Sequence, residues 1–64
     1  MNRLTKDFYE KEVLLQAIEA YKSLATISFS EDSNFYYYEI RESVYDAKLV
    51  ESEFENYILG LMNT

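Results

Sequence analysis

Residues 25–41 read ATISFSEDSNFYYYEIR, and this stretch decides the fold of the chain. The first six residues alternate apolar side chains with small hydroxyl-bearing ones, which is the pattern of a half-buried strand. The polar residues 31–34 have the length and composition of a hairpin turn. The aromatic run that follows predicts a second strand over 35–41. We therefore expect an antiparallel hairpin in the middle of the chain.

Alternation divides the second predicted strand into two faces. Ile40 is the surest core residue of the stretch, so Tyr36 and Tyr38, on the same face, are expected to point into the core. The opposite face carries Phe35, Tyr37 and Glu39. Tyr37 is the aromatic residue that we expect to be most exposed. Exposed aromatic side chains are enriched where proteins bind one another, so this face is a candidate contact surface.

A helix is predicted before the hairpin. Apolar residues recur at helical spacing from residue 8 to about residue 24. Asp7 and Glu10 have the spacing of a capping box, in which the Asp7 side chain would accept from first-turn amides. Residues 1–6 are expected to be a frayed lead-in.

A second helix is predicted after the hairpin, over about 47–62. Asp46 is a candidate cap for its first turn, and Ser52 with Glu55 offers a second capping box. Residues 42–46 fit either the end of the strand or a loop. The predicted order is therefore helix–strand–strand–helix, a single α+β domain over residues 1–64 in which a two-stranded antiparallel hairpin packs on two helices.

Length and composition limit what stabilises this domain. A chain of 64 residues is near the size at which one core is only marginally sufficient. It contains no cysteine and no histidine, so neither a disulfide nor an ordinary zinc site is expected. With 48% hydrophobic and 17% aromatic residues it is too apolar for a disordered tail. We expect it to fold, with self-association into a homodimer as an open alternative.

The net charge of −6 is concentrated in the second half of the chain. Acids and bases balance over residues 1–30, whereas residues 31–64 carry the whole acidic excess. Direct nucleic-acid binding is not expected, because phosphate neutralisation needs a basic surface. Membrane association is not expected either, since no apolar run is long enough to span a bilayer and no signal-peptide pattern is present. A cytoplasmic protein is the simplest interpretation.

Nothing in the sequence predicts catalysis. The commonest general base and the strongest nucleophile are missing, and one glycine, Gly60, cannot form a phosphate-binding loop. Glu31 and Asp32 could hold a hard cation only weakly, because the ligand array of a calcium loop is absent. We therefore expect no catalytic residues, no bound metal and no cofactor, and a protein that is not an enzyme.

Binding of a peptide or protein is better supported. Each edge of a two-stranded hairpin presents unpaired amides and carbonyls that can accept an extended peptide as an added strand. The residues expected to contact such a partner are Phe35, Tyr37, Glu39 and Arg41, with Phe29 and Tyr36 supporting them from beneath.

Part of the chain resembles a known family. The helical run FYEKEVLLQAIEAY over residues 8–21, the two predicted strands, and EFENYIL over residues 53–59 are similar to the small HxsD-like proteins of the His-Xaa-Ser peptide-modification systems. The resemblance covers roughly residues 8–60. The chain is shorter than those proteins and lacks their loop glycines before the second helix. The resemblance implies a non-enzymatic accessory protein that acts beside radical SAM enzymes modifying ribosomally made peptides.

Two hypotheses for the function follow. The first is an accessory or adaptor module that binds a precursor peptide, its radical SAM modifying enzyme, or both, through a strand edge and the adjacent aromatic residues. The alternative is an acidic inhibitor that mimics nucleic acid and blocks a basic groove of a nuclease or polymerase. The acids that such a mimic would use are Glu31, Asp32, Glu42, Asp46, Glu51, Glu53 and Glu55.

Overall fold

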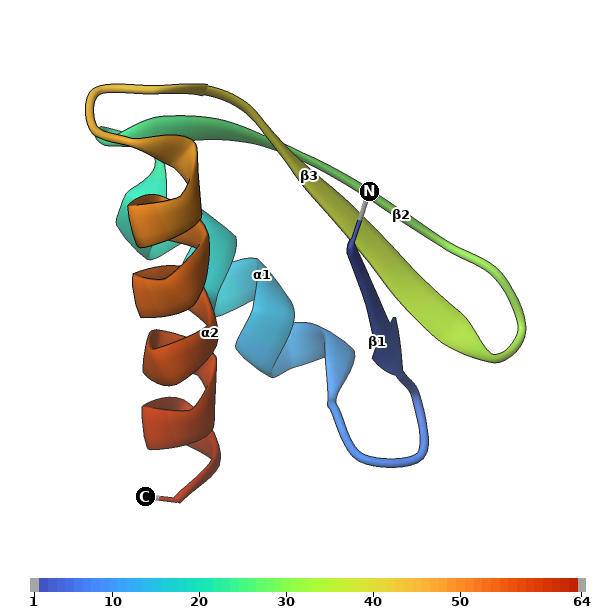
Figure 1. The fold of residues 1–64 in the computed structure, drawn as a ribbon. Coiled ribbons are helices and arrows are strands. Elements are labelled where there is room, and N and C mark those ends of the chain that lie inside the picture. Colours follow the sequence, from blue (N-terminus) through green and yellow to red (C-terminus); the bar gives the residue numbers. More distant parts are fainter. Residues whose placement is uncertain (1, 64) are drawn as a thin grey trace.

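The structure, a computed structural model, describes residues 2–63 as three strands and two helices (Figure 1). The elements are β1 (Asn2–Thr5), α1 (Lys11–Tyr21), β2 (Ala25–Glu31), β3 (Phe35–Ser43) and α2 (Ala47–Met62). The strands form one antiparallel sheet in the order β1-β3-β2, and both helices lie on one face of it. The predicted α+β class is confirmed, but the sheet has three strands instead of a two-stranded hairpin.

β1 is the element that the sequence pattern does not predict. The expectation of a frayed lead-in over residues 1–6 is wrong for Asn2–Thr5, which pair antiparallel with β3; residue 1 lies outside the described residues. Leu4 lies opposite Tyr36 and is buried with it. Four residues are too few for alternation to be visible, so this strand depends on its pairing with β3.

α1 is shorter than the predicted helix and begins without a side-chain cap. Its N-cap residue is Glu10, whose side chain makes no capping hydrogen bond, so the predicted capping box of Asp7 and Glu10 is wrong. The backbone N–H groups of Phe8 and Tyr9 donate instead to the carbonyl of Thr5, at 3.3 and 3.1 Å. A tight turn thus connects β1 to the helix.

α2 begins where the sequence predicts. Asp46 Oδ1 accepts hydrogen bonds from the backbone N–H groups of Lys48 and Leu49, at 2.9 and 3.3 Å, which confirms it as the cap. Ser52 and Glu55 lie inside the helix and do not mark a start. β3 continues through Ser43, and the connection to α2 is correspondingly short.

The core lies between the sheet and the two helices. Tyr36 and Tyr38 point into it, as alternation predicts, whereas Ile40 is only partly buried against it. The Tyr38 hydroxyl donates a hydrogen bond to Glu55 Oε2 on α2. Burial and this bond raise the pKa of Tyr38 far above its ordinary value of 10.0. The buried cluster consists of Leu4, Leu14, Ala17, Tyr36, Tyr38, Phe54 and Ile58.

Aromatic rings join the two helices. The Tyr21 ring meets the rings of Phe54 and Tyr57 edge-on, each with centroids 5.6 Å apart. Phe54 is buried to 1% exposure and also contacts Tyr38, so it connects α2 with both α1 and the sheet. Within residues 2–63, neither helix combines the length and the apolar character that crossing a membrane requires.

Candidate functional site

The predicted contact residues lie on the sheet face that no helix covers. Phe35, Tyr37 and Glu39 alternate along β3 on the side opposite the buried tyrosines. Arg41 is the extra residue of a β-bulge, because Thr26 of β2 pairs with Glu42 while Ile27 pairs with Ile40. An ion pair of 3.2 Å joins Arg41 Nη1 to Glu39 Oε1.

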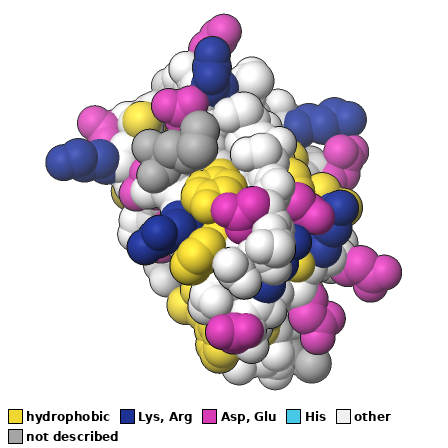
Figure 2. Space-filling model, turned by 90° about the vertical axis from the view of Figure 1, so that its right-hand side faces the viewer, with side chains coloured by type: hydrophobic (Ala, Val, Ile, Leu, Met, Phe, Trp, Pro, Cys, Tyr) yellow, Lys and Arg dark blue, Asp and Glu magenta, His cyan; other side chains and the backbone are white. Residues whose placement is uncertain are grey.

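Phe35 and Tyr37 are half-buried by their neighbours on this outer face. The Arg3 guanidinium of β1 lies over the Phe35 ring, 4.4 Å from its centroid. The two aromatic rings are 6.3 Å apart between centroids. Figure 2 views the molecule from the side of the β2–β3 turn and shows hydrophobic side chains near the middle of the face, with charged ones around them. The sequence pattern does not predict that Arg3 belongs to this group.

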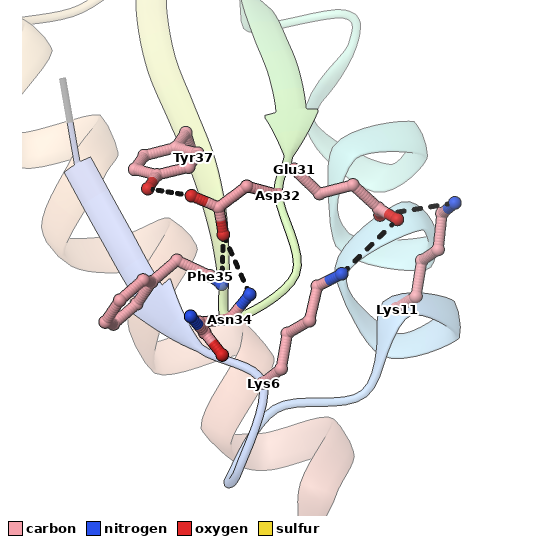
Figure 3. Close-up of polar contacts among 7 residues, drawn as sticks. All are labelled: Lys6, Lys11, Glu31, Asp32, Asn34, Phe35 and Tyr37. Atoms are coloured by element: carbon pink, nitrogen blue, oxygen red, sulfur yellow. Dashed lines mark hydrogen bonds and ion pairs between the residues drawn. The ribbon is translucent and has the colours of Figure 1, made fainter.

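Tyr37 is also fixed by the β2–β3 turn. Asp32 Oδ1 accepts from the backbone N–H groups of Asn34 and Phe35, both at 2.8 Å, and Asp32 Oδ2 accepts from the Tyr37 hydroxyl at 2.5 Å (Figure 3). The bond from Tyr37, followed by the two backbone bonds, lowers the pKa of Asp32, and the same carboxylate raises the pKa of the Tyr37 hydroxyl. Tyr37 is therefore a positioned side chain with its hydroxyl already engaged.

The strand edge beside these aromatic residues is not open. β1 pairs with Phe35–Tyr38, so β3 is the central strand there. A partner strand therefore cannot pair with this part of β3. The sequence predicts a free edge directly beside Phe35 and Tyr37, but in the structure the free edge and these two residues lie in different places. The outer face holds the aromatic residues, and the longer free edge belongs to β2.

The alternation of backbone hydrogen bonds along β2 shows which of its N–H and C=O groups face the outer edge of the sheet. Leu24 pairs with Val44 through the bond from Val44 N to Leu24 O, 2.8 Å, and Asp32 N donates to Phe35 O at 3.0 Å. Bonded positions alternate along an antiparallel strand, so the even-numbered residues of β2 bond to β3. Ile27 and Phe29 consequently direct their N–H and C=O groups to the outer edge, where no other strand of the described residues lies.

The side chains along this edge do not block pairing. Residues 25–30 contain no charged residue and no proline, the devices that commonly protect an edge strand. Ile27 and Phe29 point to the helix side, where they are half-buried, and Thr26, Ser28 and Ser30 point to the outer face. The Phe29 ring stacks on Tyr36 at 5.8 Å between centroids, so Phe29 supports the edge from within.

An ion-pair group closes one end of the edge. Glu31 lies 3.5 Å from Lys6 Nζ and 3.3 Å from Lys11 Nζ at the start of α1 (Figure 3). The hydrogen bond from Lys11 and the charges of both lysines lower the pKa of Glu31. Lys6 and Lys11 thus tie the end of β2 to the segment before α1 and to the first residue of that helix.

Most of the acidic residues that a nucleic-acid mimic would use make hydrogen bonds or ion pairs within the chain. Asp32 and Asp46 hold a turn and a helix start, and Glu31 is paired with two lysines. Glu51 accepts a 2.7 Å hydrogen bond from Asn2, and Glu55 accepts from Tyr38. Within residues 2–63, no three side chains of the metal-binding types are grouped closely enough to hold an ion.

The most exposed apolar side chains lie elsewhere than on the predicted face. Val44 and Tyr45, in the connection from β3 to α2, and Phe8, before α1, are each at least 59% exposed. Helical or strand periodicity gives no signal in such short connections.

No protein-family model, no curated protein and no solved structure matches the chain.

Proposed function

We propose that this protein is a non-enzymatic accessory module that binds an extended segment of a partner polypeptide as a fourth strand, at the outer edge of β2. The observation that carries this proposal is the seven-residue edge strand with the backbone groups of Ile27 and Phe29 directed outward and no charge or proline over residues 25–30. Added strands bind through such main-chain groups, while host side chains supply the selectivity.

The outer face contributes a second contact in this proposal. Tyr37 lies opposite Ser30 of β2, and Phe35 is two residues before it on the same face of β3. Both would meet the body of a partner whose extended segment pairs at the edge. Glu39 and Arg41 continue that contact along β3. Because Arg3 and Asp32 fix the two rings, they present a rigid surface that loses little side-chain entropy on binding.

The resemblance to HxsD-like proteins supports a choice of partner. In our proposal the bound segment belongs to a ribosomally made precursor peptide or to the radical SAM enzyme that modifies it, in the cytoplasm. Charge mimicry of nucleic acid is less well supported, since most of the acids concerned are engaged inside the chain.

A pair of variants at one position tests the edge. Ile27→Pro removes an outward N–H group and Ile27→Ala removes side-chain volume without touching the backbone. Both proteins and the unmodified one would be used for affinity capture from the native host, with mass spectrometry of the bound proteins. We expect Ile27→Ala to retain the partner and Ile27→Pro to lose it. Equal retention by both, or capture of a nuclease or polymerase that salt releases, would contradict the proposal.

A further inference from the structure

We infer that the groove between the exposed side of α1 and Tyr57 of α2 docks a short, basic amphipathic helix of a partner protein. This groove belongs to the helical layer of the molecule, whereas the strand edge and the aromatic residues of the proposed function belong to the sheet (Figure 1). The inference does not depend on strand addition at β2. It gives the chain a second binding surface.

Two apolar side chains form the floor of the groove. Leu15 of α1 is 46% exposed and Tyr57 of α2 is 41% exposed, and both line the same hollow together with Gln16. The Tyr57 ring meets the Tyr21 ring edge-on, with centroids 5.6 Å apart, so it is held against α1. Tyr21 in turn contacts the buried Phe54. The floor is therefore fixed by the core while its upper surface stays exposed.

Carboxylates surround this apolar floor. Glu12 and Glu19 line the groove, the first about one turn before Leu15 and the second about one turn after it. Burial and then the charge of Glu53 raise the pKa of Tyr21, so this third carboxylate, on α2, lies near the same rings. The rim of the groove is therefore acidic on both helices.

Little of this negative charge is neutralised within the chain. Glu19 pairs with Lys22 at 3.1 Å, but both side chains are more than 70% exposed, and such a pair is weak. Glu12 and Glu53 make no hydrogen bond or ion pair with any other residue of the described range 2–63. The rim therefore keeps an excess of negative charge that a partner can neutralise.

The acidic rim and the apolar floor together select the occupant. A purely apolar partner would take the carboxylates out of water without a counter-charge, and an anionic partner would be repelled. Two copies of this chain packed antiparallel about a twofold axis at Leu15 would set Glu12 of one copy against Glu19 of the other. Basic side chains that flank apolar ones satisfy both the rim and the floor.

The main chain of the groove favours a helix over an extended segment. Along the groove, α1 and α2 bond their N–H and C=O groups within the helices, so an added strand would find no main-chain partners. A docked helix satisfies its own main chain and binds through side chains. Glu12 and Glu19 are seven residues apart, about 10.5 Å along α1. A partner helix with basic residues seven positions apart and two apolar residues between them, on the same face, matches this spacing.

Two synthetic peptides of identical composition test the inference. The probe is acetyl-Ala-Ala-Gln-Ala-Arg-Ala-Ala-Leu-Leu-Ala-Ala-Arg-Ala-Ala-Gln-Ala-amide, whose two arginines share a helix face with its two leucines. The control is acetyl-Ala-Ala-Arg-Ala-Gln-Ala-Ala-Leu-Leu-Arg-Ala-Ala-Ala-Ala-Gln-Ala-amide. It keeps the spacing of the arginines and places them on the opposite face.

Binding would be followed at low salt by the amide chemical shifts of the isotope-labelled protein. We expect the control to bind about fivefold more weakly, since it forgoes two exposed ion pairs. This difference should shrink as the ionic strength is raised to about 1 M. The shifts that move should be those of α1 and of Tyr57, and movement confined to β2 would overturn the inference.

Matched variants identify the groups that act. Glu12→Gln should narrow the difference between probe and control, whereas Glu42→Gln, which removes an exposed charge from β3, should leave it unchanged. Leu15→Ala should weaken both peptides. Leu59→Ala should weaken neither, because that residue is 39% exposed but does not line the groove.

Equal affinity for the two peptides, or a difference that Glu12→Gln leaves unchanged, would overturn a basic helix as the occupant. Dilution of the free protein tests a second copy in that place. We expect the shifts of Leu15 and Tyr57 to be independent of protein concentration. A concentration dependence would show that the groove is a contact between copies, and it would overturn the inference.

Discussion

The Tyr37 hydroxyl and the Asp32 carboxylate are joined by a 2.5 Å hydrogen bond that connects the outer face of β3 to the turn before it. Asp32 also accepts from the two backbone N–H groups that close the turn. One carboxylate therefore fixes the start of β3 and the orientation of the aromatic residue proposed to contact a partner.

Acidification should loosen this turn. The pKa of Asp32 is lowered in the folded protein, so its contribution to stability is present above the ordinary value of 3.8 and is lost as the pH falls through the lowered one. We expect Asp32→Asn to melt at a lower temperature than the unmodified protein at pH 6, and this difference to be smaller at pH 2. Thermal unfolding followed by circular dichroism measures it. A difference of the same size at both pH values would contradict the role of the charge.

Removal of the Tyr38 hydroxyl should destabilise the domain. In Tyr38→Phe the Glu55 carboxylate loses its hydrogen-bond donor beneath α2, which should cost about 1–3 kcal/mol in the free energy of unfolding. Urea denaturation at pH 7 measures the loss. Tyr45→Phe is the matched control, because Tyr45 is 60% exposed and the same change there should stay within about 0.5 kcal/mol.

The same tyrosine predicts an alkaline limit to stability. Because the pKa of Tyr38 is raised in the folded state, its contribution is complete below the unfolded value of 10.0 and is lost as the pH rises above it. The free energy of unfolding should fall above pH 10, and it should fall less steeply in Tyr38→Phe. If the free energy of unfolding falls equally steeply with pH in the two proteins, then groups other than Tyr38 control the loss of stability at alkaline pH.

Loss of the Leu4 side chain should uncouple β1. Leu4→Ala removes buried apolar volume opposite Tyr36 and should cost about 2–4 kcal/mol. Val44→Ala shortens an apolar side chain that is 68% exposed and should change stability by less than about 0.5 kcal/mol. Comparable urea midpoints for these two variants would mean that β1 contributes little to the fold.

Hydrogen exchange should alternate along β2. The amides of Ser28 and Ser30 bond to β3 and should be protected, whereas those of Ile27 and Phe29 face the outer edge and should exchange quickly. Residue-resolved exchange by NMR in the absence of any peptide reads this pattern directly. Uniform protection along the strand would show that the edge is already covered.

The sequence predicts the helices and strands that are long enough to show a helical or strand period. α2 follows from its apolar spacing and from Asp46, and the two faces of β3 follow from strict alternation through Tyr36 and Tyr38. β1 escapes prediction because four residues carry no period of their own. α1 begins later than expected because Phe8 and Tyr9 belong to a turn that is closed by backbone bonds to Thr5.

The candidate site is predictable only in part for a related reason. Alternation places Phe35 and Tyr37 on the outer face, but which strand occupies the edge depends on the sheet order, and that order is set by a distant pairing with Asn2–Thr5. The contact of Arg3 with Phe35 depends on the same pairing. Local patterns therefore identify the faces of strands, and only the tertiary structure identifies the free edge.

The central place of β3 also has a consequence for the order of folding. β1 precedes β2 and β3 in the described chain, and its partner residues in β3 lie more than halfway along it. The β2–β3 hairpin can close locally, whereas pairing by β1 bears the entropy of a long loop closure. During folding the chain should therefore first form a hairpin whose β3 edge is still open, and pairing by β1 completes the sheet last.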